Sequence, residues 1–299
     1  MPPAPSRVTL ILNPSSGKGR AQELLPRVAA CLRDGGLDVT IRPSRDYDEA
    51  RALIETAAGA GGAVVVMGGD GMIHLGLNAV AARRAAGHRD VTLGMIPAGT
   101  GNDLCRGLGL DPDDAIAAAR SIVAGRTELV DVIEIAGRRI GTVLATGFDA
   151  MVNRRANAMA WPKGSTRYPL ATLAELRVFS PLRYRLVIDG ERRDLDAMLV
   201  AVGNTCCYGG GIRICPDADP RDARLDLTII HPVSRFRLLR LLPKLYTGEF
   251  VTDPCVERLH AEEVSVDGPG LVAFGDGELL GATPLTARIA PSALPVHLP

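Results

Sequence analysis

The chain contains 299 residues, more than a single hydrophobic core usually supports, so we expect two domains. Hydrophobic residues make up 46% of the sequence, which is enough to fill both cores. Basic and acidic residues balance at 34 each, and the formal net charge of +0 excludes a chain-wide attraction to nucleic acid or to an anionic membrane. Any attraction of that kind must be local.

The cysteines and the N-terminus indicate a protein of the reducing cytoplasm. Six free thiols are expected, because no CxxC pair or His-rich cluster suggests zinc. The N-terminal segment lacks the apolar stretch of a signal peptide, and no window reaches the length of a membrane span. We therefore expect a cytoplasmic protein and leave open a peripheral contact with the inner membrane surface.

The first half alternates between short apolar runs and stretches with helical spacing. Residues 63–67 (AVVVM) form a continuous apolar run, which is typical of a strand buried on both faces. This alternation predicts a parallel sheet with helices on both faces. The predicted strands are 8–12, 39–41, 63–67 and 91–96. Four helices are predicted: one that ends near Arg33, one over 48–58, one that follows the GGDG turn, and one over 111–124.

Past Gly125 the pattern changes to short strands joined by glycine-containing turns, which is typical of an antiparallel sandwich. The fold class is therefore α/β, with a doubly wound parallel-sheet nucleotide domain (1–125) followed by an antiparallel β-sandwich domain (126–289). The predicted strands of the second part are 130–135, 139–145, 184–188, 197–202, 225–230, 263–266, 271–274 and 286–289, and its helices are 168–179 and 234–246.

Three loops of the first half follow predicted strands: NPSSGKG (13–19), GGDG (68–71) and PAGTGND (97–103). The carboxyl ends of parallel strands form a ligand crevice, so the three loops should converge on one edge. Glycines let the backbone approach a phosphate, and the following helix directs its positive end at the site. Each loop alone is more often a tight turn; three in register favour a nucleotide site.

Asp70 is the discriminating residue of this edge. A carboxylate in a phosphate nest is repulsive unless it holds a metal, usually through water. A cap on the following helix is the alternative role for this side chain. Two further acidic groups lie in the second half, PDADPRD (216–222) and GDGE (275–278), where metal binding or catalysis competes with a solvated turn.

Taken in order, these motifs resemble the diacylglycerol kinase catalytic family, which includes bacterial soluble diacylglycerol kinases and sphingosine and ceramide kinases. The resemblance implies an α/β nucleotide domain, a β-sandwich domain with the active site between them, and a last segment (290–299) that returns to the first domain. The matching pieces are NPSSGKG, GGDG, IPAGTGND, TGFDA (146–150), the stretch 206–227 (CCYGGGIRICPDADPRDARLDL), GDGELL and the terminal APSALPVHLP.

Carried over by position, the resemblance implies that ATP and Mg²⁺ bind here. Asp70 would join the catalytic magnesium network through water, and Glu278 would be the general base that takes a proton from a lipid hydroxyl. A second, structural magnesium would be held by Asp222, with backbone oxygens of Asp219 and Arg224. The implied ATP contacts are Asn13, Pro14, Ser15, Ser16, Gly17, Ser44, Gly69, Asp70, Gly71, Met72, Ile73, His74, Leu75 and Thr100.

The sequence departs from the family pattern beside the GGDG turn. The family usually has Thr and then an Asn-Glu pair where this chain has Met72, His74 and Leu75, and the glycine after the structural-metal aspartate is Ala223 here. A lone histidine at a helix start is usually solvated. These changes leave open a protein that binds nucleotide or lipid without turnover.

A lipid kinase takes its substrate from a bilayer, and residues 234–246 (SRFRLLRLLPKLY) combine leucines on one side with cations on another. Packing on the protein's own core is the alternative for such a helix. The expected partners are a lipid substrate, with diacylglycerol or a sphingoid base as acceptor, and a transient membrane surface, but no nucleic acid. Exposed sandwich edges leave a homodimer open, and the shared GGDG turn leaves open an NAD-kinase-like phosphotransferase.

Overall fold

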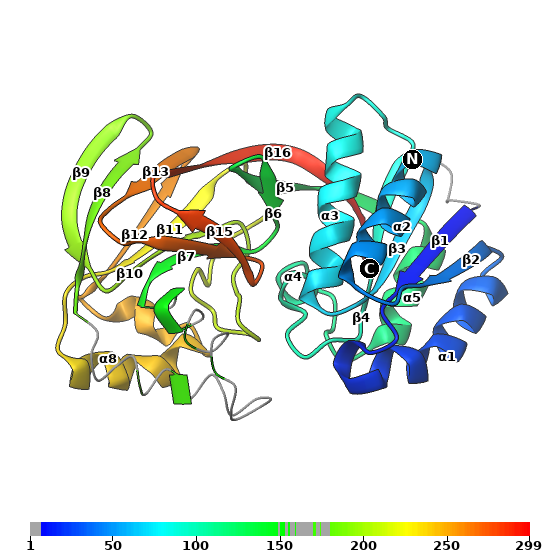
Figure 1. Cartoon of the computed structure of the whole chain (residues 1–299), viewed down its shortest axis with the longest axis horizontal. Helices are drawn as coiled ribbons and strands as arrows, with labels where there is room; N and C mark the ends of the chain where they lie inside the picture. Colours follow the sequence, from blue (N-terminus) through cyan, green and yellow to red (C-terminus); the bar gives the residue numbers. More distant parts are fainter. Residues whose placement is uncertain are drawn as a thin grey trace.

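The computed structural model describes residues 7–148, 150–152, 155, 159, 170–171, 174 and 180–299. Its described part forms two lobes joined by β5 (Thr127–Ile135) and β16 (Leu285–His297), which run side by side between them (Figure 1). The predicted helix 168–179 lies largely outside the described residues, as does Asp149 of the TGFDA motif. The six cysteines are free, as expected.

The first lobe is built on a parallel sheet in the order β2-β1-β3-β4. Helix α3 packs on Val66, whereas Ile122 of α5 reaches the side of Val65, so helices cover both faces of this sheet. The strands are β1 (Arg7–Leu12), β2 (Asp38–Pro43), β3 (Gly62–Gly68) and β4 (Val91–Pro97); the helices are α1 (Arg20–Asp34), α2 (Tyr47–Ala60), α3 (Asp70–Ala85), α4 (Asp103–Gly107) and α5 (Ala115–Ala124).

The second lobe is a sandwich of two antiparallel layers. One layer continues the first sheet through β16 to β13, β8 and β9, and the other is a six-stranded sheet in the order β12-β11-β10-β7-β14-β15. The predicted fold class is confirmed. The strands are β6 (Arg138–Ile140), β7 (Val143–Gly147), β8 (Leu182–Ile188), β9 (Glu191–Ala197), β10 (Leu199–Gly203), β11 (Leu225–Ile230), β12 (Val256–Ala261), β13 (Glu263–Asp267), β14 (Val272–Gly275) and β15 (Glu278–Ala282).

The six-stranded sheet is buried on both faces. In β10, Val200 and Val202 point into the core between the layers, while Leu199 and Ala201 join a second apolar layer on the outer face. That outer layer is completed by α8 (Arg235–Leu241) and the short 3₁₀ helices η2 (Leu242–Leu245) and η3 (Glu249–Thr252). In Figure 1 α8 lies along the lower edge of this lobe.

Several predicted boundaries were wrong. Residues 139–145 form two strands separated at Gly141 and Thr142, and the predicted strand 286–289 is only the start of the longer β16. The missed strands β9, β12 and β15 lie at sheet edges, where polar side chains hide strand periodicity. Because the ten-stranded sheet runs through both lobes, the domain boundary near Gly125 stays a prediction. Among the described helices, none is long and apolar enough to cross a membrane.

Candidate active site

The three glycine-containing loops of the first lobe meet at the carboxyl edge of its sheet. Gly17 has φ +60°, and a Cβ there would lie 2.1 Å from the carbonyl oxygen of Ala98. A Cβ on Gly99 would lie 2.3 Å from the Cα of Gly69, so both contacts require glycine. The backbone N–H of Ala98 donates to the carbonyl oxygen of Gly68 at 2.8 Å. The loops form one continuous backbone surface.

Asp70 organises this surface. Its carboxylate accepts hydrogen bonds from the backbone N–H groups of Asn102 at 3.1 Å and Asp103 at 2.7 Å. Asp70 is the first residue of α3 and does not cap that helix; its carboxylate instead binds the start of α4. Burial raises the pKa of Asp70, and the two backbone hydrogen bonds only partly offset that effect.

Asp103 connects this loop to the second lobe. Its carboxylate accepts hydrogen bonds from the backbone N–H groups of Gly210 and Gly211, both at 2.8 Å. Burial raises the pKa of Asp103 to about 6, and the nearby charge of Asp70 acts in the same direction. The sequence contained both motifs but no sign of this contact, because about a hundred residues separate them.

A cavity of about 370 Å³ opens over the three loops. The first lobe contributes Ser16, Lys18, Asp70 and Thr100, and the GDGE turn of the second lobe contributes Glu278. The cavity therefore combines hydroxyl groups, a cation and carboxylates from both lobes. We refer to it as the phosphate pocket.

The GDGE turn is fixed by Asp276, whose side chain is only 6% exposed. Its Oδ1 accepts hydrogen bonds from the backbone N–H of Thr142 at 3.0 Å and from Thr142 Oγ1 at 2.6 Å. Its Oδ2 lies 3.0 Å from the backbone nitrogen of Gly141 and 3.0 Å from Nδ1 of His74. Burial alone would raise the pKa of Asp276, but the hydrogen bonds led by His74 outweigh it and leave the pKa below its usual value.

His74 is therefore not solvated, contrary to expectation. It is buried on α3 and contacts Asp276, because the turn between β14 and β15 folds over this helix face. Asn78, one helical turn further on, holds the same face against β6: its Nδ2 donates to the carbonyl oxygen of Arg139, and its Oδ1 accepts from the backbone N–H of Arg139. The substituted position thus joins the two lobes.

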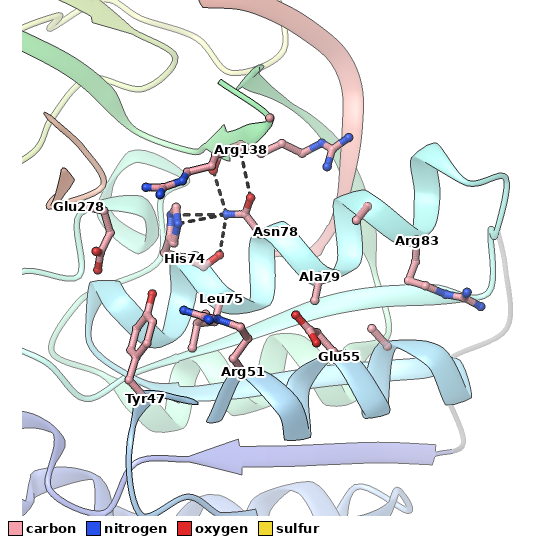
Figure 2. Close-up of a pocket in the computed structure, with 14 residues that line it drawn as sticks. Tyr47, Arg51, Glu55, His74, Leu75, Asn78, Ala79, Arg83, Arg138 and Glu278 are labelled. Carbon is pink, nitrogen blue, oxygen red and sulfur yellow. Dashed lines mark hydrogen bonds between the residues drawn. The ribbon is translucent and has the colours of Figure 1, made fainter. Parts of the chain in front are cut away.

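A larger cavity of about 700 Å³ lies beside the phosphate pocket, between α2, α3 and the turn before β6. Glu278 lines both cavities. Figure 2 shows the Glu278 carboxylate and the Tyr47 hydroxyl pointing toward one another across its opening. Burial raises the pKa of Tyr47, and the negative charge of Glu278 raises it further. We refer to this cavity as the side pocket.

The residues implied for ATP fall into four groups. Ser16, Gly17, Gly69, Asp70, Gly71 and Thr100 line the phosphate pocket, and His74 and Leu75 line the side pocket. Met72 and Ile73 are buried in the core of the first lobe. Asn13, Pro14, Ser15 and Ser44 line neither pocket.

Asn13 and Ser44, which line neither pocket, form hydrogen bonds at or beside the first loop. The Oδ1 of Asn13 accepts from the backbone N–H and the hydroxyl of Ser15, which tightens the first loop. The hydroxyl of buried Ser44 donates to the carbonyl oxygen of Leu12 at 3.2 Å. The Asn13 Oδ1 and the Ser44 hydroxyl therefore form hydrogen bonds within the protein.

The acidic loop before β11 lies apart from both pockets. The Oδ1 of Asp222 accepts from the backbone N–H of Arg224 at 3.0 Å, and Asp219 pairs with Arg221. Ala223 has φ +60°, which explains why glycine suits this position. Asp222 Oδ2 accepts no hydrogen bond from the described residues, so one carboxylate oxygen is free for a cation.

The acids at the phosphate pocket suit a magnesium ion bound mainly through water and phosphate. Within the described part of the chain, no group of three or more His, Cys, Asp or Glu side chains could hold a metal by itself. Asp70 nevertheless lines this pocket, and its charge is one cause of the raised pKa of Asp103, so the two carboxylates lie near each other. Mg²⁺ usually keeps several waters and takes one or two carboxylates plus substrate phosphates.

Two family models match the chain. The model described as the diacylglycerol kinase catalytic domain matches residues 7–135, and the model described as the YegS C-terminal NAD kinase beta sandwich-like domain matches residues 142–298. A diacylglycerol kinase of Mycobacterium tuberculosis is 42% identical over 302 residues, which cover 98% of this chain and 95% of that protein. The chain belongs to the diacylglycerol kinase catalytic family.

Other members of the family are also similar to this chain over most of its length. The diacylglycerol kinase of Bacillus subtilis is 25% identical over 281 residues, covering 93% of this chain and 91% of that protein. A crystal structure of a diacylglycerol kinase from Bacillus anthracis superposes with a TM-score of 0.75 at 20% identity, covering 98% of this chain and 97% of that chain, which shows the shared fold. The predicted membership is confirmed, and with it the class of enzyme, a lipid kinase.

Proposed function

We propose that the protein transfers the γ-phosphoryl group of ATP to the hydroxyl of diacylglycerol, with Mg²⁺ as cofactor and Glu278 as general base. The observation that carries this proposal is the position of Glu278, which lines both the phosphate pocket and the side pocket. A carboxylate placed there lies next to the group that is transferred. It is positioned to act on a hydroxyl brought to the same junction.

The two pockets suit the two parts of ATP. Backbone N–H groups, hydroxyls of Ser16 and Thr100 and the Lys18 cation favour phosphates in the phosphate pocket. The side pocket, at about 700 Å³, is within the range of small-molecule sites, and the Tyr47 ring lines it. We assign the nucleoside to the side pocket, with Leu75 and His74 forming part of its wall.

The chemistry needs positioning and charge neutralisation more than covalent catalysis. The Glu278 carboxylate takes the proton of the acceptor hydroxyl as its oxygen bonds to the γ-phosphorus and the bond to the ADP oxygen breaks. Lys18 and the loop N–H groups offset the negative charge of the phosphates. Mg²⁺, when bound near Asp70 and Asp103, would supply the remaining charge neutralisation.

The choice of diacylglycerol as acceptor is supported by the relatives named diacylglycerol kinase. A second magnesium at Asp222, with backbone oxygens of Asp219 and Arg224, would stabilise the acidic loop rather than take part in transfer. Contact with a membrane surface follows from the same proposal, because diacylglycerol resides in bilayers.

The test is transfer of label from γ-labelled ATP, with Mg²⁺, to diacylglycerol in uncharged detergent micelles. Sphingosine and NAD serve as competing acceptors, since the second family model names NAD kinase. We expect label in the product of diacylglycerol and loss of about 10²- to 10⁴-fold in kcat for Glu278→Gln. Glu191→Gln, an exposed glutamate of β9, is the matched control and should keep full activity.

Label in NAD alone would contradict the lipid acceptor. Binding of ATP without transfer to any acceptor would show an inactive family member. Full activity of Glu278→Gln would remove Glu278 from the role of base while leaving the kinase assignment intact.

A further inference from the structure

Three large apolar side chains are exposed in one short segment of the second lobe. Phe236 is 82% exposed, Leu239 is 43% exposed and Tyr246 is 59% exposed. Phe236 and Leu239 lie in α8, and Tyr246 directly follows η2. Exposed apolar groups that cluster in this way mark a binding surface more often than scattered ones do.

The same segment is anchored by a different face. Leu238, Leu241 and Leu245, spaced by three and four residues, are buried in the apolar layer on the outer face of the six-stranded sheet. Ser234 caps the helix by accepting a hydrogen bond from the backbone N–H of Arg237 at 3.3 Å. The leucine side of this helix, considered from sequence as the membrane side, is therefore the core side.

The face that points away from the core also carries side chains at helical spacing. Phe236, Leu239, Pro243 and Tyr246 follow one another at intervals of three, four and three residues, and all four are exposed. Packing within the lobe does not require these side chains, because the buried leucines already attach the segment. We call this set of four residues the docking face.

Cations surround the docking face. Arg235, Arg240 and Lys244 are exposed, and none of them forms an ion pair with a described residue. Arg237 is instead paired with Asp253. Residues 227–248 contain no Asp or Glu, so a chain of formal net charge +0 carries a local excess of positive charge here.

We propose that the docking face binds a bilayer surface that contains anionic lipids, with Phe236 and Leu239 inserted between headgroups and the cations on lipid phosphates. This inference rests on the proposed function for its biological reason, since the acceptor resides in a bilayer. A second copy of the chain fits less well. A symmetric contact would place the same cations opposite each other, and no acid lies within the segment to pair with them.

The first experiment measures co-sedimentation of the full chain with phosphatidylglycerol vesicles and with phosphatidylcholine vesicles. We expect binding to phosphatidylglycerol that weakens as salt is raised, and little binding to phosphatidylcholine. Arg235→Glu with Arg240→Glu, and separately Phe236→Ser with Leu239→Ser, should each reduce the binding on the order of tenfold or more.

Matched controls lie elsewhere on the surface. Leu129→Ser removes another 43% exposed leucine, and Arg120→Glu reverses an exposed arginine of α5; both should bind like the wild type. Thermal melts confirm folding of every variant. If a double variant unfolds, the single change Phe236→Ser replaces it in the binding measurement, because Phe236 is more exposed than Leu239 or Tyr246. Equal binding to both vesicle types, wild-type binding by the docking-face variants, or binding only to an acidic protein would overturn the proposal.

An activity assay separates this proposal from the proposed function. Docking-face variants should phosphorylate a short-chain diacylglycerol in uncharged micelles at the wild-type rate but lose activity on diacylglycerol in phosphatidylglycerol vesicles. Equal loss in both assays would overturn the docking role. A wild-type protein that binds phosphatidylglycerol vesicles and phosphorylates no lipid would leave the docking face standing and refute the proposed function.

Discussion

His74 and Asp276 join the two lobes through a contact of 3.0 Å between Nδ1 and Oδ2. His74 lies one turn into the helix that follows the GGDG loop, and Asp276 lies two residues before the proposed base Glu278. The contact therefore links the helix that follows the GGDG turn to the turn that carries the proposed base. His74, which departs from the family pattern beside the GGDG turn, thus forms a contact between the two lobes at the site.

Replacing His74 by Ala should lower kcat about tenfold, because the GDGE turn loses one of its anchors and Glu278 shifts. The free energy of unfolding should fall by about 1–2 kcal/mol, since buried Asp276 keeps only its bonds to Gly141 and Thr142. His74→Asn, whose amide can donate to Asp276, should recover most of kcat. His88→Ala changes an exposed histidine and is the control. Equal kcat for His74→Ala and wild type would remove the positioning role.

Asp103→Asn should loosen the loop around Gly210 and Gly211. The new amide places an NH₂ group where a carboxylate oxygen accepts from a backbone N–H, at a cost of about 1–3 kcal/mol. Hydrogen exchange by mass spectrometry should show faster exchange in the peptide that contains these glycines. Asp113→Asn, an exposed aspartate nearby in sequence, is the control. Unchanged exchange would show that the contact does not hold the loop.

Ala223→Gly should raise the free energy of unfolding by about 0.5–1 kcal/mol. Ala223 has φ +60°, a conformation that costs Ala more than Gly, and the gain exceeds the extra entropy that glycine gives the unfolded chain. Chemical denaturation measures the change. Ala117→Gly, at an exposed position of helix α5, should shift stability in the opposite direction. A loss of stability in Ala223→Gly would contradict the strain assigned to this turn.

Because of His297, the free energy of unfolding should fall as the pH is lowered from 6.5 to 4. Burial lowers the pKa of His297 to about 4, and its Nε2 lies 2.9 Å from Thr92 Oγ1. Below pH 6.5 the unfolded chain binds a proton at this residue that the folded chain excludes, so stability falls, on the order of 3 kcal/mol by pH 4. His297→Gln should flatten this part of the profile relative to wild type. Parallel profiles for the two proteins would refute the assignment.

The sequence predicted those parts of the fold that depend on local pattern. Uninterrupted apolar runs such as 63–67 identified the buried parallel strands, and glycines at strand ends identified the three loops that meet at the carboxyl edge of the sheet. The edge strands were not predicted, because a run such as Glu191–Ala197 is mostly charged. Side-chain contacts between distant segments were not predicted either, since no local pattern shows that Asp103 contacts Gly210. Asp276 was visible in its motif, but its burial depends on helix α3 of the other lobe.

Strand β16 has a consequence for the order in which the protein is made. It is the neighbour of β4 in the first sheet, through the pair Val296 and Leu93, and it is the last strand of the chain. During synthesis the strands of the second lobe therefore emerge from the ribosome before the strand that covers the edge of β4. The parallel sheet gains its neighbour at β4 only when the second lobe has been made, so the folding of the first lobe is coupled to the presence of the second.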